Sequence, residues 1–315
     1  MEWNRETKGV ALALLTAITA GIATPANKWF LVSLDPLLFT AIRSILCGIF
    51  FLALSYWFWS KEERKKSFAV SWNYLFAIAF IGGAIAFWLF FSGLKLTTAI
   101  RGTFLHKTLP LYVVVLSYFF LREKITRKHL IGIGLMVLGT AAIYFTQISP
   151  SDLWANPQLG DLMVLGAAAL WGIETVLSKK AMIQGETNWM VSFARMFFGG
   201  LILFGFMILL GKTSILLSLT AAQWFNILMS TFLLLLYVLF FYWSLQLINA
   251  SKAAMYLLLA PVISLFIGIL FLGEPAPAMQ WIGSAIILLG CYLLSRLKSE
   301  TRSPNVSISE SRVVN

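Results

Sequence analysis

GLKLTTAIRGTFLHKTLPLYVVVLSYFFLREKI, residues 93–125, aligns without a gap with SLQLINASKAAMYLLLAPVISLFIGILFLGEPA, residues 244–276. Pro110 then matches Pro261, and glutamates and glycines further along show the same separation of 151 residues, the difference between 110 and 261. Self-similarity at one fixed separation indicates a repeated structural unit. The sequence therefore predicts a tandem duplication of about 150 residues.

The composition indicates an integral membrane protein. Hydrophobic residues make up 59% of the chain and charged residues 12%, whereas soluble domains carry about 25% charge. The apolar runs are continuous, as in LILFGFMILL at residues 201–210, and they lack the alternation expected for the strands of a membrane barrel. Because helices and closed barrels are the structures that satisfy the backbone in lipid, these runs predict membrane-spanning helices.

Ten such helices are expected, five in each copy of the duplication. They lie near residues 8–31, 36–59, 72–93, 99–121, 128–147, 160–183, 188–210, 221–246, 252–272 and 277–296. Because five is an odd number, the two copies enter the membrane in opposite directions, and such inverted repeats are typical of transporters. We expect the first repeat over residues 1–149, the second over 150–298, and a disordered cytoplasmic tail over 299–315.

The distribution of basic residues predicts the orientation. Four basic residues lie in the run 61–66, whereas the matching loop of the second copy has only Lys212. The loop 122–128 is also basic, whereas the matching loop around Glu274 is not. Basic loops lie on the cytoplasmic side, so both termini are expected there, in the plasma membrane of a prokaryote. The net charge of +11 is therefore attributed to orientation and lipid contact rather than to nucleic-acid binding.

The paired signature of an alanine-rich helix start, a proline within the helix and a glutamate at its exit resembles the EamA family of the drug/metabolite transporter superfamily. It is carried by Ala253-Ala254, Pro261 and Leu272-Gly273-Glu274, and more weakly by Thr98-Ala99, Pro110 and Leu121-Arg122-Glu123. The resemblance implies an all-α integral membrane carrier of ten transmembrane helices, arranged as two inverted five-helix repeats around a central cavity. It implies transport of small metabolites, often amino acids or other polar solutes, with export favoured. The resemblance does not identify the solute.

The most unusual polar cluster lies in the fourth predicted helix. Thr103, His106, Lys107 and Pro110 share one helical face by their spacing. Pro110 is expected to kink the helix and free the carbonyl of His106. This face is predicted to bind substrate, and the second copy has leucines at the positions of the histidine and lysine. The alternative is that Lys107 pairs with a distant carboxylate and that His106 is merely hydrogen-bonded.

Other buried polar residues are candidates for the same site. Glu174 lies deep in the sixth predicted helix, one turn after Trp171. It is expected to neutralise Lys107 or Arg195 or to hold a proton during transport. Asn27 follows a proline that interrupts the first helix, and broken helices often form carrier sites.

Arg43 and Arg195 occupy nearly equivalent positions in the second and seventh helices, so an anchoring role is favoured over substrate contact. Trp88, Tyr237 and Tyr256 are predicted to line the cavity and pack on a substrate. Lys252 matches Arg101 at the start of its helix, and both are expected to snorkel to the membrane surface. Close helix packing is predicted for the glycines at 132, 134, 139, 283 and 290.

No enzyme, cofactor or metal motif is apparent in the sequence, and Cys47 and Cys291 lie in apolar segments. We therefore predict a secondary carrier for a small polar metabolite, an amino acid or a related zwitterion or anion, with protons as a candidate coupling ion. The alternative from another class is a non-transporting membrane sensor or assembly subunit that retains a carrier fold. An anion and a zwitterion both remain open as the substrate.

Overall fold

The computed structural model describes residues 4–58, 72–272 and 275–300. These residues form helices and connecting turns, with no strand among them. The basic run 61–66, Glu274 and the tail from residue 301, on which part of the sequence prediction rests, lie outside the described residues.

The first half contains the five predicted long helical segments, two of which are subdivided. Their bounds are α1 (Arg5–Leu31), α2 (Pro36–Phe58), α4 (Trp72–Ile78) continued by η1 (Ala79–Ile85) and α5 (Ala86–Leu96), α6 (Ala99–His106) followed by α7 (Leu109–Phe120), and α8 (Arg127–Tyr144). Each segment agrees with its predicted range to within a few residues at either end.

The second half repeats this order after the short helix α9 (Pro150–Ala155). Its elements are α10 (Leu159–Ile183), α11 (Asn188–Phe193) continued by η2 (Ala194–Phe198) and α12 (Gly199–Leu209), α13 (Ser214–Leu217), α14 (Ala221–Leu247), α15 (Ala250–Met255) continued by η3 (Tyr256–Leu259) and α16 (Ala260–Leu272), and α17 (Ala278–Ser295).

Nine helical stretches among the described residues are long and apolar enough to cross a membrane. The segment that does not meet this test is α8, whose 18 residues begin with Arg127, Lys128 and His129. These three polar residues lower the mean hydropathy of a helix that is otherwise apolar. The tenth predicted crossing is therefore present as a helix but is not supported by its composition.

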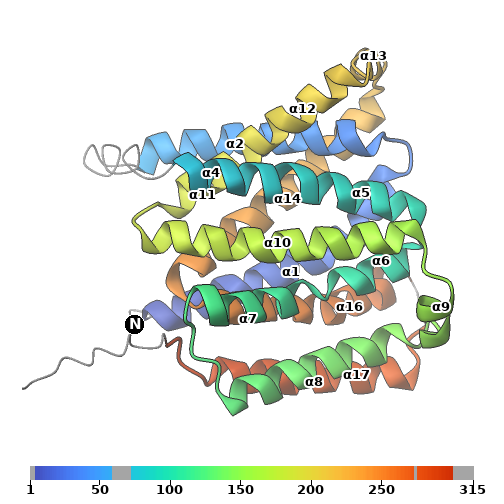
Figure 1. The fold of residues 1–315 in the computed structure, drawn as a ribbon. Helices are drawn as coiled ribbons and strands as arrows, with labels where there is room; N and C mark the ends of the chain where they lie inside the picture. The colour runs from blue at the N-terminus through green and yellow to red at the C-terminus, as the bar shows by residue number, and fades with distance from the viewer. Residues whose placement is uncertain (1–3, 59–71, 273–274, 301–315) are drawn as a thin grey trace, which may run out of the picture.

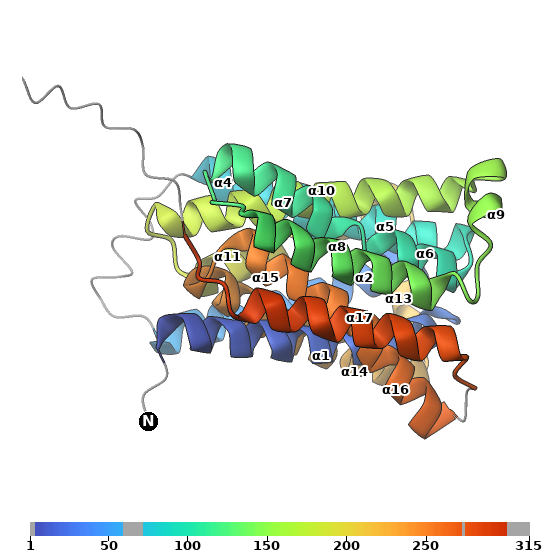
Figure 2. The same cartoon turned by 90° about the horizontal axis from the view of Figure 1, so that it is seen from below.

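The two halves pack through equivalent partners. Helix α1 packs along α14 and α10 packs along α5, so the first helix of each half contacts the third helical segment of the other. The second segments, α2 and α12, also pack together, as do the last segments, α8 and α17. Figures 1 and 2 show the long helices lying side by side, with α1 and α10 running in opposite directions. The end of the bundle where α1 begins is called the proximal end, and the end where α1 stops is called the distal end.

Glycines set the contact between α8 and α17. A Cβ atom on Gly139 would lie 2.5 Å from the carbonyl oxygen of Gly283, and a Cβ on Gly290 would lie 2.7 Å from that of Gly132. A side chain at these positions would force the two backbones apart, so the predicted packing role is confirmed for these four glycines. Gly134 differs, because a Cβ there would meet nothing within 4 Å.

Two π-helical segments, η1 and η2, contact each other between α4–α5 and α11–α12. A Cβ atom on Gly83 would lie 2.0 Å from the carbonyl oxygen of Arg195, and one on Gly199 would lie 2.5 Å from the Gly83 backbone. The close approach therefore requires glycine at both positions. It fixes the backbone of Arg195 at the centre of the bundle, where the candidate site lies.

Candidate functional site

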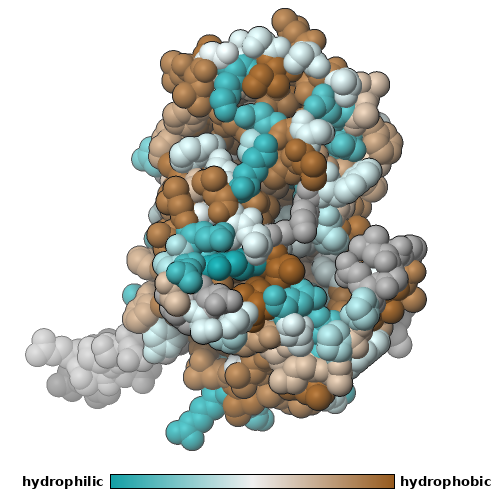
Figure 3. All heavy atoms as spheres, turned by 90° about the vertical axis from the view of Figure 1, so that its right-hand side faces the viewer, coloured by the Kyte–Doolittle hydropathy of each residue, from teal (hydrophilic) through white to brown (hydrophobic). Residues whose placement is uncertain are grey.

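A cavity of about 390 Å³ lies between the two halves, a volume in the range of small-molecule sites. Seven of the nine predicted site residues line it, namely Asn27, Thr103, His106, Lys107, Trp171, Glu174 and Tyr237. The lining extends to Val32 and Thr97 near the distal end. Figure 3 faces this end and shows hydrophilic side chains gathered between hydrophobic flanks.

The fourth helical segment is broken at the cavity. Helix α6 ends at His106, Lys107 and Thr108 form a turn, and α7 begins at Leu109. Pro110 has no N–H, so it cannot donate to the carbonyl of His106 four residues earlier. The predicted interruption is confirmed, and it brings two side chains of the break and the first turn of α7 to the cavity wall.

Lys107 is a buried cation without a partner among the described residues. Its side chain lines the cavity and the residue is 7% exposed. No carboxylate of the described chain lies within ion-pair distance of it. The alternative in which Lys107 pairs with a distant carboxylate is therefore not what the structure shows.

His106 lies in a ring cluster. Its imidazole centroid lies 4.9 Å from that of Phe90 and 5.2 Å from that of Trp171. The indole of Trp171 donates to the carbonyl oxygen of Gly82 at 3.0 Å, which holds it in place. The imidazole has no hydrogen-bond partner within the described part of the chain, so its nitrogens remain available at the cavity wall.

Glu174, by contrast, is fully engaged. One carboxylate oxygen accepts hydrogen bonds from the hydroxyls of Ser178 and Tyr242, both at 2.5 Å. The other lies 3.4 Å from Nε of Arg195, although the orientation of that N–H does not make a hydrogen bond. The predicted pairing with Arg195 is therefore present and that with Lys107 is absent.

Arg43 is held without a carboxylate. Its Nη1 donates to the hydroxyl of Ser230 at 2.9 Å, and that hydroxyl donates to Oδ1 of Asn27 at 2.6 Å. The guanidinium carbon lies 4.4 Å from the ring centroid of Phe91 and 4.8 Å from that of Phe39, within cation–π range. This environment agrees with the anchoring role favoured for the arginine pair.

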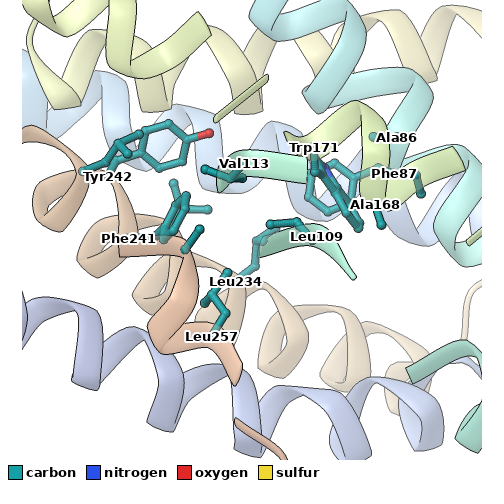
Figure 4. Close-up of a cluster of buried hydrophobic side chains, with 14 of the residues drawn as sticks. Ala86, Phe87, Leu109, Val113, Ala168, Trp171, Leu234, Phe241, Tyr242 and Leu257 are labelled. Atoms are coloured by element: carbon teal, nitrogen blue, oxygen red, sulfur yellow. The ribbon is translucent and has the colours of Figure 1, made fainter. Parts of the chain in front are cut away.

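Apolar side chains complete the wall. Figure 4 shows Leu109, Leu234 and Leu257 close to one another, with Phe241 beside them. The same view places Phe87 against Trp171, and their centroids lie 5.2 Å apart in an edge-to-face arrangement. The cavity therefore combines a largely apolar surface with a few fixed polar groups, as expected for small-molecule sites.

Two predicted site residues do not line the cavity. Trp88 is 45% exposed, on the outer side of α5. Phe87 and Phe91 face inward one turn apart, and Trp88 is rotated by about 100° from Phe87. Tyr256 is fully buried within η3, and Leu257 takes the place at the cavity. Both differences arise because a helix that is apolar all round does not reveal its inward face in the sequence.

Sequence reasoning missed three contributors. Phe90 joins the inward face of α5, three residues after Phe87, and that spacing was the available signal. Ser230 links Arg43 to α1, but a single serine in an apolar helix carries no signal of such a contact. The hydroxyl of Tyr242 is likewise revealed only by its tertiary contact with Glu174.

An ion pair closes the distal side between α6 and α10. Arg101 donates to Oδ2 of Asp161 and, at 3.1 Å, to the carbonyl oxygen of Asn156. Thr97 donates to the other oxygen of Asp161 at 2.5 Å. Arg101 was expected to snorkel, but it is 8% exposed because this carboxylate supplies a partner inside the bundle.

The equivalent ion pair at the proximal end joins α15 to α1. The ammonium of Lys252 donates to Oε1 of Glu6 at 2.6 Å and also to the carbonyl oxygen of Leu297. Lys252 is 1% exposed, so the expectation of snorkelling is wrong here too. Nearby, Glu123 accepts the backbone N–H groups of residues 250–251, which fixes the start of α15.

A third link joins two turns outside the spans at the distal end. Lys212 donates to Oδ2 of Asp35 at 2.9 Å. Partial burial alone would raise the pKa of Asp35, but the hydrogen bond and charge of Lys212, with backbone N–H groups, outweigh burial and lower the pKa. The described residues contain no cluster of three or more histidine, cysteine, aspartate or glutamate side chains that could hold a metal ion.

Comparisons with known proteins agree with this architecture. The model of the EamA-like transporter family matches residues 7–145 and 158–296, one match in each half. An uncharacterized transporter of Methanothermobacter thermautotrophicus is 26% identical over 302 residues, which is 90% of this chain and 85% of the relative. The uncharacterized transporter YoaV of Bacillus subtilis is 28% identical, over 87% of this chain and 91% of its own length.

A solved protein structure superposes with a TM-score of 0.70 and covers 91% of this chain and 95% of the other. Its sequence identity is 18%, so this likeness concerns the fold alone.

Proposed function

The chain belongs to the EamA-like transporter family, and from this premise we propose that it is a secondary carrier that moves a small polar metabolite by alternating access. The observation that carries the proposal is the cavity between the two halves, with Lys107 on its wall and no protein partner for it among the described residues. A charge within membrane-spanning helices is costly unless a partner or a water-filled cavity receives it. A polar solute bound between the halves would be such a partner.

The proposal includes ten membrane crossings in two inverted repeats. The reciprocal packing of α1 on α14 and of α10 on α5 supports it, because a two-fold relation between the halves requires both contacts. The glycine-mediated contact of α8 with α17, itself a candidate span, supports α8 as the tenth crossing.

Two matched ion pairs support alternating access. Arg101 binds Asp161 across the halves at the distal end, and Lys252 binds Glu6 across the halves at the proximal end. Residues 101 and 252 are equivalent in the duplication. Opening one end requires only one pair to part, so the two pairs are suited to act as alternate gates.

The proposed orientation places the proximal end in the cytoplasm, with transport outward across the plasma membrane of a prokaryote. Basic side chains support this orientation, because Lys124, Lys179 and Arg296 belong to the proximal half of the bundle. A proton is the proposed coupling ion. His106 is the better candidate to carry it, because Glu174 is committed to three other side chains.

Transport by proteoliposomes tests the function. Metabolites that accumulate differently in expressing and deleted cells nominate the solute, and the purified full-length chain should then exchange it across the vesicle membrane. His106→Phe should lower the initial rate about 10-fold, the effect of losing one hydrogen bond, while keeping the ring contacts. Trp88→Phe, a change outside the cavity on the neighbouring helix, should leave the rate unchanged.

Correctly folded protein that moves no solute in this assay would contradict the carrier. Stable association with a partner protein in the same preparation would then favour the sensor or assembly subunit. Equal rates for His106→Phe and the unaltered chain would remove His106 from the site while leaving the carrier in place.

A further inference from the structure

We propose that the cavity selects organic monocarboxylates with a compact apolar body and discriminates against the same molecules bearing an ammonium group. This inference rests on the proposed carrier function and makes its substrate class specific. It decides between the anion and the zwitterion, which the sequence leaves open.

The carboxylate is assigned to Lys107. This side chain is more than nine-tenths buried, lines the cavity and has neither an ion-pair nor a hydrogen-bond partner among the described residues. A buried charge left uncompensated is strongly unfavourable, so the site gains most from a ligand that brings the opposite charge. A carboxylate forms short, charge-assisted hydrogen bonds with an ammonium.

The chain around Lys107 adds to the preference for an anion. Helix α7 has 12 residues and starts directly after the break, and Leu109 and Pro110 of its first turn line the cavity. The N-terminal end of a helix carries partial positive charge. His106, whose imidazole has no hydrogen-bond partner in the described chain, lies next to the lysine and can bind a second oxygen of the ligand.

The cavity has no group ready to receive an ammonium. Glu174 is the only carboxylate on the described lining, and Arg195, Ser178 and Tyr242 already occupy it. Oδ1 of Asn27 already accepts from a serine hydroxyl. An amino acid would therefore lose hydration of its ammonium without an equivalent partner, and this cost is large in a buried site.

One available cation matches one negative charge. Of the other cations on the described lining, Arg43 binds a serine hydroxyl, Lys95 donates to the carbonyl oxygen of Leu34 at 2.8 Å, and Arg195 pairs with Glu174. A dianion such as a phosphate monoester would bring a second charge without a second available cation. A monocarboxylate is therefore favoured over a phosphate.

The body of the ligand is assigned to the aromatic wall. Phe90, His106 and Trp171 form a cluster with centroids about 5 Å apart. Tyr237 and Phe241 are stacked on another part of the lining, with centroids 5.8 Å apart. A planar or branched apolar group would bury its surface between these rings, and the volume of about 390 Å³ limits it to a compact molecule.

Four probes that differ in one or two groups test the inference. They are 3-phenylpropanoate, phenylalanine, 3-phenylpropanamide and phenethylammonium, and their affinities for the full-length chain in lipid nanodiscs are measured by quenching of tryptophan fluorescence and by thermal shift. We expect 3-phenylpropanoate to bind about 10- to 100-fold more tightly than each of the other three, the range for one charged hydrogen bond.

Lys107→Gln supplies the second test. It should remove most of the preference for 3-phenylpropanoate over 3-phenylpropanamide while leaving binding of the amide unchanged. Lys212→Gln, which removes a cation outside the cavity, should alter neither affinity. If Lys107→Gln does not fold, the probe series on the unaltered chain still decides the question. Tighter binding of phenylalanine or of the amide, or no binding of 3-phenylpropanoate, would overturn the inference.

Flux separates this inference from the function on which it rests. Proteoliposomes that move phenylalanine but not 3-phenylpropanoate would retain the carrier and reject the proposed selectivity. Tight binding of 3-phenylpropanoate without flux of any solute would retain the selectivity and reject the carrier.

Discussion

At the residue scale, the buried charges divide into those satisfied by protein and one left for a ligand. Arg43 is satisfied by a hydroxyl and aromatic faces, and Arg195 by Glu174. Lys107 lacks such a contact among the described residues. The sequence showed that all of these were buried, but it could not show which cation Glu174 would choose. That choice depends on the crossing of η1 and η2, which places Arg195 beside the carboxylate.

Glu174→Gln tests this division. The substitution leaves the guanidinium of Arg195 buried without a counter-charge, and breaking a buried pair in this way costs about 3–5 kcal/mol. Thermal unfolding in detergent should therefore show a large loss of stability. Ser178→Ala removes only one neutral donor from the same carboxylate and should cost about 1 kcal/mol. Equal effects of the two substitutions would contradict the assignment of Glu174 as the counter-charge of Arg195.

At the scale of elements, the sequence predicted what leaves a chemical mark. Pro110 marked the break between α6 and α7, and the duplicated glycines marked the contact of α8 with α17. The π-helical turns of η1 and η2 were not predictable, because they depend on a contact between segments distant in the chain. The inward face of α5 was also missed, since Trp88 and its phenylalanine neighbours are all apolar.

The contact between α8 and α17 offers a matched pair of substitutions within one helix. Gly139→Ala places a methyl group 2.5 Å from the carbonyl oxygen of Gly283, and such overpacking costs about 1–3 kcal/mol. Gly134→Ala meets nothing within 4 Å and should be neutral or stabilising by up to about 1 kcal/mol, because alanine favours helix. Melting temperatures of the two variants measure the difference, and a lower value for Gly134→Ala would contradict the packing described here.

At the scale of the whole molecule, the duplication explains why the two ends carry equivalent ion pairs. Arg101 and Lys252 start equivalent helical segments, and each binds a carboxylate on the first long helix of the other half. The carboxylates themselves, Asp161 and Glu6, are not equivalent in the repeat, so the alignment alone could not predict the pairing. The fold supplied the common geometry, and each end then found its own partner.

This pairing predicts which substitution opens which end. An Ala23→Cys reporter lies on the cavity lining, and a membrane-impermeant thiol reagent is applied to either side of vesicles that contain the full-length chain. Lys252→Gln should speed labelling several-fold from the proximal side, because it leaves Glu6 without its cation, and Arg101→Gln should do so from the distal side. Lys124→Gln removes an exposed pair with Glu300, which contributes about 0–1 kcal/mol, and should change neither rate. The native Cys47 and Cys291 are buried, so the chain without the reporter gives the background rate. If both gate variants raised labelling from the same side, the two pairs would not be alternate gates, and the shared position in the duplication would reflect architecture alone.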